Sequence, residues 1–143
     1  MSSVPDTTNL GFLLAKASQR WNERLAGGFA QRGHGDVRPS YGSVLLPLWE
    51  SDGLRIGRLA ERARLSKQTM TTLVRLCERD GLVTTVRDPA DGRATLVSLT
   101  DRARGLGMVA GEVVAELERE VEHRLSPAGS RALAEALQEV MQL

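Results

Sequence analysis

Residues 56–75 read IGRLAERARLSKQTMTTLVR, and this stretch decides the fold. Its first apolar face belongs to a helix that ends near residue 63, and consists of Leu59, Ala60 and Ala63. A second apolar stripe follows the i, i+3, i+4, i+7 spacing of a buried helix face, and consists of Met70, Leu73, Val74 and Cys77. Two such helices joined by a short turn at Arg64 and Leu65 predict a helix-turn-helix.

The second helix is predicted to span Lys67 to Asp80. Ser66 suits its first turn because its hydroxyl can accept a backbone N–H, and Gly81 suits the left-handed residue that ends a helix. Outside the buried stripe the helix presents donors and small hydroxyls without a carboxylate, on Lys67, Gln68, Thr71, Thr72 and Arg75. Such a face suits base edges and phosphates. It favours DNA binding over an ordinary solvated face, which usually mixes Glu with Lys and Arg.

The residues that follow alternate in polarity as a β-hairpin does. Residues 83–87 form one run, and residues 93–99 form the second run after the turn Asp88-Pro89-Ala90-Asp91-Gly92. Arg87 and Arg93 flank the tip, where an arginine can enter a neighbouring minor groove. Helix, turn, helix and basic hairpin together predict a winged helix.

These motifs resemble the MarR (multiple antibiotic resistance regulator) family of bacterial transcriptional regulators in order and spacing. The matching positions are Leu59-Ala60-Glu61, Leu65-Ser66, Thr69, Leu73-Val74, Leu76, Glu78, Gly81-Leu82-Val83, Asp91-Gly92-Arg93 and Val97-Ser98-Leu99-Thr100. The resemblance implies a homodimer, usually a repressor, in which the N-terminal and last two helices interlock across a two-fold axis. It also implies that Asp91 steadies Arg93 by a charge-assisted bond.

The expected architecture is mainly α-helical with a small β wing, in one domain of residues 1–143. Residues 9–33 and 103–143 are the expected dimerisation helices, and residues 39–100 the winged helix-turn-helix lobe. The first helix should run from Leu10 to about Ala30, and Pro47 should kink or shorten a second helix that opens at Pro39-Ser40. Leu54-Arg55-Ile56 can add a short third strand. Thr100 should cap a long helix, and Ser126-Pro127 should begin a last helix that runs to the chain end.

Charge is divided unevenly along the chain. Residues 54–104 carry eleven basic and six acidic side chains, a net +5, whereas the remainder carries −4, and together they give the overall +1. Positive charge therefore concentrates on the winged helix, as binding to a polyanion requires.

The N-terminus lacks the basic start and apolar core of a signal peptide, and no apolar run approaches membrane length. We expect a cytoplasmic protein that needs no membrane.

Several side chains allow a second interpretation. Cys77, the single cysteine, suits either an oxidant sensor or an inert core position, and its place in the buried stripe favours the core. His34 and His123 lack neighbouring histidines, which favours surface residues over metal ligands.

In the family, small aromatic effectors bind between the dimerisation helices and the DNA-binding lobe. The residues that suit such a cleft are Trp21, His34, Tyr41 and Trp49, although aromatics at helical spacing are more often core.

The sequence thus predicts a homodimeric, sequence-specific DNA-binding repressor that recognises a palindromic operator and is released by a small-molecule effector. The predicted DNA-binding residues are Ser66, Lys67, Gln68, Thr69, Thr71, Thr72, Arg75, Arg87, Asp91 and Arg93. The alternative is a winged-helix module for dimerisation or protein interaction with little specific DNA binding. An enzyme ranks third, because no catalytic, metal or phosphate-binding motif appears, and we expect no cofactor.

Overall fold

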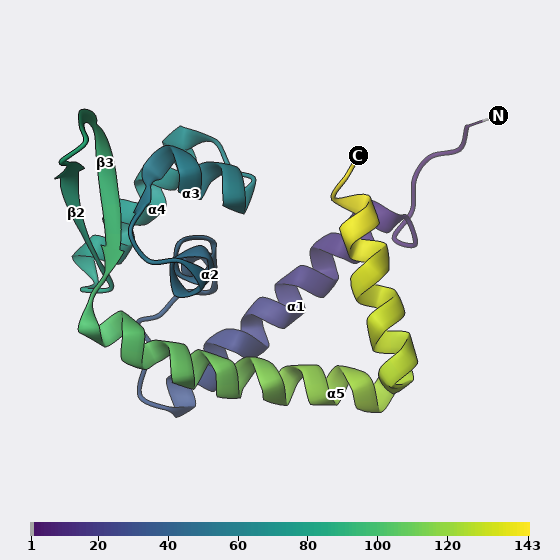
Figure 1. The fold of residues 1–143 in the computed structure, drawn as a ribbon. Helices are drawn as coiled ribbons and strands as arrows, with labels where there is room; N and C mark the ends of the chain where they lie inside the picture. The colour runs from purple at the N-terminus through teal and green to yellow at the C-terminus, as the bar shows by residue number, and fades with distance from the viewer. Residues whose placement is uncertain (1) are drawn as a thin grey trace.

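A computed structural model describes residues 2–143 and confirms a mainly helical fold with a small antiparallel sheet (Figure 1). In chain order the elements are α1 (Leu10–Gln31), the 3-10 helix η1 (Pro39–Tyr41), α2 (Gly42–Glu50), β1 (Leu54–Arg55), α3 (Ile56–Ala63), α4 (Lys67–Arg79), β2 (Val83–Asp88), β3 (Asp91–Leu99) and α5 (Asp101–Val140). None of the helices in this part of the chain combines the length and the apolar character needed to cross a membrane.

The helix-turn-helix consists of α3 and α4, and its boundaries follow from local chemistry. Ser66 caps α4 as predicted, because its side chain accepts the backbone N–H of Thr69 at 3.1 Å. Gly81 adopts the left-handed conformation, with φ of +73°, and ends the helix. Arg64 makes the turn between the helices, also with a positive φ, of 56°. The helix ends at Arg79 with Asp80 as its C-cap, one residue earlier than predicted.

The wing is a three-stranded antiparallel sheet in the order β1-β3-β2. The predicted short strand before the helix-turn-helix is confirmed for Leu54 and Arg55, which pair with Val97 and Leu96, whereas Ile56 begins α3 instead. The hairpin turn is tighter than the predicted five residues: β2 continues to Asp88 and β3 begins at Asp91, which leaves Pro89 and Ala90 between the strands.

A core runs through the lobe and joins it to the helices outside it. The largest fully buried side chains include Tyr41, Leu45, Leu48, Leu59, Met70, Leu82 and Leu106. The last of these belongs to α5, so the winged helix and the long helix share one core. The helix α2 does not end at Pro47, which is buried within it, but continues to Glu50.

The helices α1 and α5 form a frame beside the lobe. They approach so closely that a Cβ on Gly28 would stand 2.6 Å from Cγ1 of Val113, which explains the glycine at this position in α1. Arg32 reinforces the contact by pairing with Glu116 at 2.7 Å, and Arg24 pairs with Glu120.

The long helix breaks sharply at Ser126, as its Ser-Pro signature predicts. Ser126 has non-helical angles, φ of 70° and ψ of 161°, and its hydroxyl accepts the N–H of Gly129. The C-terminal arm, residues 127–143, therefore leaves at a steep angle to the first part of α5, and Figure 1 shows it turning back toward the N-terminal end of α1. Its helix ends at Val140, slightly before the predicted chain end.

Candidate nucleic-acid interface

The outer face of α4 is exposed and carries the side chains that the sequence placed there. Lys67, Gln68, Thr69, Thr72 and Arg75 are exposed, and Thr71 is half-buried. The opposite face of the helix is anchored by Met70, Val74 and Cys77, each at most 2% exposed. The anchored stripe fixes the rotation of α4 about its axis, so its polar face must point outward.

The basic side chains of this face and of the wing form no ion pairs within residues 2–143. These are Lys67, Arg75, Arg87 and Arg93, all exposed. By contrast, nine other arginines of the described chain are paired with a carboxylate: Arg20, Arg24, Arg32, Arg55, Arg58, Arg62, Arg79, Arg102 and Arg104. Four unpaired cations on two adjacent elements leave their charge available to a polyanion.

The threonine hydroxyls on α4 are less free than their sequence positions suggest. Thr71 and Thr72 each donate to the backbone carbonyl four residues earlier, at 2.9 and 3.2 Å, and Ser66 donates to the hydroxyl of Thr69. The donor capacity of Thr71, Thr72 and Ser66 is therefore used within the chain, whereas the Thr69 hydroxyl accepts and keeps its own O–H. Thr71 and Thr72 therefore offer acceptor lone pairs and methyl groups, which suit a cytosine or adenine amino group or a thymine methyl.

Glu78 ties the wing to α4, a role that its sequence position did not reveal. Its carboxylate accepts both the backbone N–H and the hydroxyl of Thr85 on β2, at 3.1 and 2.6 Å. This acid therefore faces the wing strand and holds it against the end of the helix. In the sequence, the one indication of this role was that Glu78 lies at the far end of the helix, away from the basic residues of its exposed face.

Arg87 and Arg93 lie at the tip of the wing, where Asp88 and Asp91 accept hydrogen bonds from nearby backbone N–H groups. Asp91 accepts the backbone N–H of Arg93 at 3.0 Å, so the support implied by the family resemblance acts on the main chain of Arg93 and not on its guanidinium. Asp88 accepts the N–H of Ala90 at 2.9 Å and pairs with Arg55 of β1 at 2.6 Å. These two bonds hold the pKa of Asp88 below its usual range. The sequence did not indicate the pair between Arg55 and Asp88.

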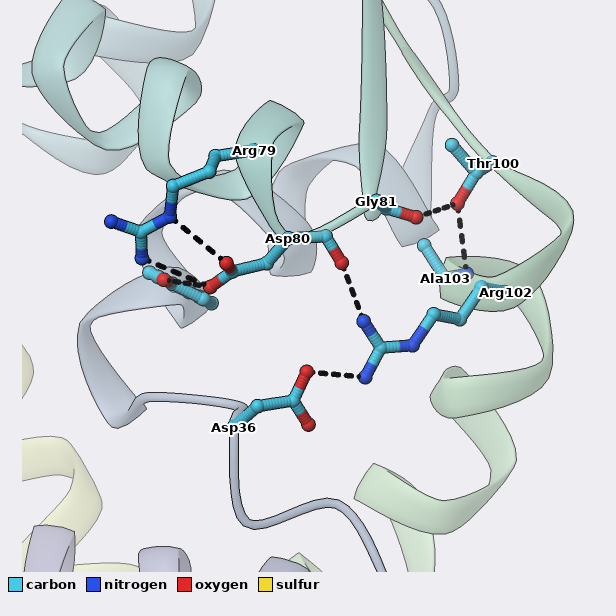
Figure 2. Close-up of polar contacts among 8 residues, drawn as sticks. Asp36, Arg79, Asp80, Gly81, Thr100, Arg102 and Ala103 are labelled. Carbon is cyan, nitrogen blue, oxygen red and sulfur yellow. Dashed lines mark hydrogen bonds and ion pairs between the residues drawn. The ribbon is translucent and has the colours of Figure 1, made fainter.

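A polar joint lies at the C-terminal end of α4 (Figure 2), and Tyr41 joins it through its bond to Asp80. Its residues are Asp36, Tyr41, Arg79, Asp80, Thr100 and Arg102. The Asp80 carboxylate accepts from Arg79 at 3.0 Å and from the hydroxyl of Tyr41. Both contacts favour the ionised acid and lower the pKa of Asp80, the Arg79 bond most. Burial, and then the bond to Asp80, raises the pKa of Tyr41.

The four residues predicted to line an effector cleft have different surroundings. Tyr41 is fully buried, and the indole N–H of Trp49 donates to the carbonyl of Ala103 at 2.9 Å. Trp21 is half-buried on α1, and His34 lies half-buried in the loop after that helix. Tyr41 and Trp49 therefore have structural partners already, whereas the cleft itself stays a prediction.

Cys77 lies in the core beneath the exposed face, and its side chain is fully buried. Burial, with a smaller effect of Asp80, raises the pKa of its thiol to about 12. The thiolate is the reactive form of cysteine, so this environment suits an inert core residue.

His123 is exposed in a shallow hollow on α5 with Glu120 and Arg124. In residues 2–143, no three His, Cys, Asp or Glu side chains come close enough together to hold a metal ion.

Comparisons with known proteins point to one family. The MarR family profile matches residues 36–94. Over 63 residues, 44% of this chain, the sequence is 41% identical to the HTH-type transcriptional regulator TtmR of Methylorubrum extorquens (strain PA1). The aligned stretch spans 32% of that regulator and 42% of a second curated relative, so it covers less than half of either protein.

The fold itself extends over nearly the whole chain in solved structures. The PcaV transcriptional regulator of Streptomyces coelicolor, in complex with its natural ligand, superposes with a TM-score of 0.83 at 24% identity and covers 99% of this chain and 98% of its own. The transcriptional repressor CouR, bound to a 23-mer DNA duplex, has a TM-score of 0.81 at 24% identity over 97% of this chain and 99% of its own. The flanking helices thus share the arrangement of these proteins as well as the winged helix.

Proposed function

We propose that this chain is a MarR-family regulator: a homodimeric, sequence-specific DNA-binding repressor that a small-molecule effector releases from its operator. In this proposal residues 39–100 form the DNA-binding lobe, and residues 9–33 and 103–143 form the dimerisation helices. The recognition helix α4 enters a major groove, and the wing tip reaches the neighbouring minor groove. The unpaired cations on α4 and the wing, Lys67, Arg75, Arg87 and Arg93, carry the proposal.

The surface area supports a dimer. The chain exposes 9780 Å², whereas a folded monomer of 15.6 kDa exposes about 7,250 Å² by the usual scaling with mass. The excess is about 2,500 Å² per chain, or about 5,000 Å² for two chains, at the upper end of the total area that obligate dimers bury. Exposed apolar side chains concentrate on the start of α1 and on the C-terminal arm: Leu10, Leu13, Leu133, Leu137, Val140 and Met141. A second copy of the chain can cover both faces across a two-fold axis.

The structural relatives support the two ligand classes. CouR was solved with a DNA duplex, and PcaV with its natural ligand. In this chain a symmetric dimer would place two copies of α4 in successive major grooves, about 34 Å apart, and would require a roughly palindromic site. An effector would act by binding more tightly to a dimer whose recognition helices no longer match that spacing.

Replacing Arg93 with alanine should weaken binding to many DNA sequences, because a wing arginine senses groove width and phosphate charge more than base identity. The slope of log affinity against log salt should fall by about 1 for each subunit, since one cation–phosphate contact is lost. Titration of wild type and variant across a salt series measures both effects. Unchanged affinity would show that the wing does not contact DNA.

A panel of aromatic acids tests the effector. Binding near Trp21 or Trp49 should change tryptophan fluorescence and raise the melting temperature, because a ligand that binds only the folded state stabilises it. If no compound moves either signal, the aromatic effector is dropped and the DNA-binding proposal stands alone.

A further inference from the structure

The C-terminal end of α4 is fastened by its main chain to the start of α5. The Thr100 hydroxyl donates to the carbonyl of Gly81 at 2.7 Å, and the Thr100 N–H donates to the carbonyl of Leu82 at 3.1 Å. The guanidinium of Arg102 donates to the carbonyl of Asp80, the C-cap residue of α4. A cation at this position also complements the negative end of the helix dipole. The end of the recognition helix is thus bonded to Thr100, the N-cap residue of α5, and to Arg102 in the first turn of α5.

The same guanidinium also reaches the loop that follows α1. Figure 2 shows one nitrogen of Arg102 directed at the Asp80 carbonyl and another directed at Asp36. The bond to the Asp36 carboxylate is 2.7 Å long and lowers the pKa of Asp36. This loop is itself held to α1, because the N–H of His34 donates to the carbonyl of Phe29 at 2.9 Å and Val37 is buried. Arg102 therefore bridges the end of α4 to both frame helices.

The other end of α4 has a tie to the frame as well. Arg64, in the turn before the helix, donates to the carbonyl of Met141 at 2.7 Å. This contact joins the helix-turn-helix to the C-terminal arm, 77 residues later in the chain. A rotation of the lobe against the frame must break a contact at one end of the recognition helix or the other.

We propose that Arg102 is a positioning residue for DNA recognition: by joining the Asp80 carbonyl to Asp36, it sets the angle of the recognition helix relative to the dimerisation helices. The inference rests on the proposed function, because the angle matters only if two recognition helices must match one operator. Arg102 does not contact DNA in this arrangement. Its contribution lies in the distance that it imposes between the two recognition helices of a dimer.

Loss of Arg102 should leave the fold intact. Arg102 and Asp36 are both substantially exposed, at 38% and 51% of their side-chain surfaces, and exposed ion pairs contribute little to the free energy of unfolding. The substitution also removes no side chain of the buried core, which includes Cys77 and Leu106. Arg102→Ala should therefore remove the bridge between Asp80 and Asp36 while the protein stays folded.

The test uses operators that differ only in half-site spacing. Wild-type full-length protein first selects its preferred duplex from a randomised pool, and that duplex is then remade with one or two extra base pairs between the half-sites. The ratio of dissociation constants for the lengthened and preferred duplexes measures spacing discrimination. Partial unfolding lowers the active fraction for both duplexes equally, so a merely structural defect cannot change this ratio.

We expect Arg102→Ala to reduce the ratio by about fivefold, the lower end of typical coupling between sites. Asp36→Ala, which removes one of the two contacts, should reduce it less. Arg104→Ala is the matched control, because it removes the same charge from the first turn of α5 while its partners are Asp101 and Asp52, outside α4. It should retain the wild-type ratio.

Two failures are distinguishable. If the wild-type protein selects no sequence from the pool, the proposed function is wrong. If the wild-type protein selects a palindromic duplex and Arg102→Ala keeps the full spacing discrimination, the positioning role is wrong while the function stands.

Discussion

Replacing Arg75 with alanine is expected to reduce affinity for the operator by about 30-fold or more. A bidentate base contact is worth about 1–3 kcal/mol of discrimination, and a symmetric dimer loses it in both half-sites, about 2–6 kcal/mol in total. Arg75 is exposed on α4 and forms no ion pair within the described chain, so its guanidinium is free for a base edge. Affinity for unrelated DNA should change far less. Competition titrations with operator and scrambled duplexes measure the two affinities separately.

Arg119→Ala supplies the control for the Arg75 experiment. It removes the same charge from an exposed position on α5, away from the recognition helix. If both variants lost operator affinity equally, bulk charge and not base contact would explain the loss. Gln68→Ala on the first turn of α4 should relax sequence preference as Arg75→Ala does, because an amide can pair with an adenine edge.

Replacing Leu137 with glutamate is expected to convert the dimer into monomers and to abolish tight operator binding. Leu137 lies on the C-terminal arm with Leu133, Val140 and Met141, all of them at least 39% exposed in the single chain. An unpaired charge buried in an interface costs about 3–5 kcal/mol, and a two-fold interface would contain two of them. A monomer carries one recognition helix and recognises one half-site. Sedimentation velocity gives the mass, and operator titration gives the affinity.

Gln138→Glu is the matched control on the neighbouring residue of the arm. It adds the same negative charge at a position that is already polar and exposed, so the dimer and its operator affinity should persist. A Leu137→Glu protein that still sediments as a dimer would place the interface elsewhere on the molecule.

Much of the fold could be predicted because its signals are local. Ser66 and Thr100 cap helices as their positions indicated, and Ser126-Pro127 breaks α5 where the sequence placed a new helix. Each of these signals acts within three or four residues, through an unsatisfied backbone group that a neighbouring side chain must satisfy. The buried stripe of α4 is equally local, because helical periodicity alone fixes which face packs inward.

The polar contacts between distant segments could not be predicted. Arg102 and Asp36 are 66 residues apart, and Arg55 and Asp88 are 33 apart. Surface ion pairs of this kind have no periodicity and no composition signal, since any exposed arginine can meet any exposed acid once the fold brings them together. At short range the resemblance implied a charge-assisted bond from Asp91 to Arg93, and the fold supplies one, but only the structure shows that the carboxylate accepts the backbone N–H.

The effector cleft illustrates a different difficulty. Trp49 and Tyr41 suit a ligand site by residue type, but in the fold the indole N–H of Trp49 donates to Ala103 and the tyrosine hydroxyl donates to Asp80. Aromatic side chains serve cores and ligand sites with the same chemistry, and the sequence does not distinguish the two uses.

The most direct test of dimeric, sequence-specific DNA recognition is fluorescence anisotropy of the purified protein with labelled DNA from around its own gene. The titration is run against scrambled competitor across a salt series. We predict tight binding that survives the competitor, saturates at two chains per duplex and falls steeply as salt rises. Binding no stronger than that to the scrambled duplex, at every salt concentration and with every duplex from that region, would contradict it and favour a winged-helix interaction module.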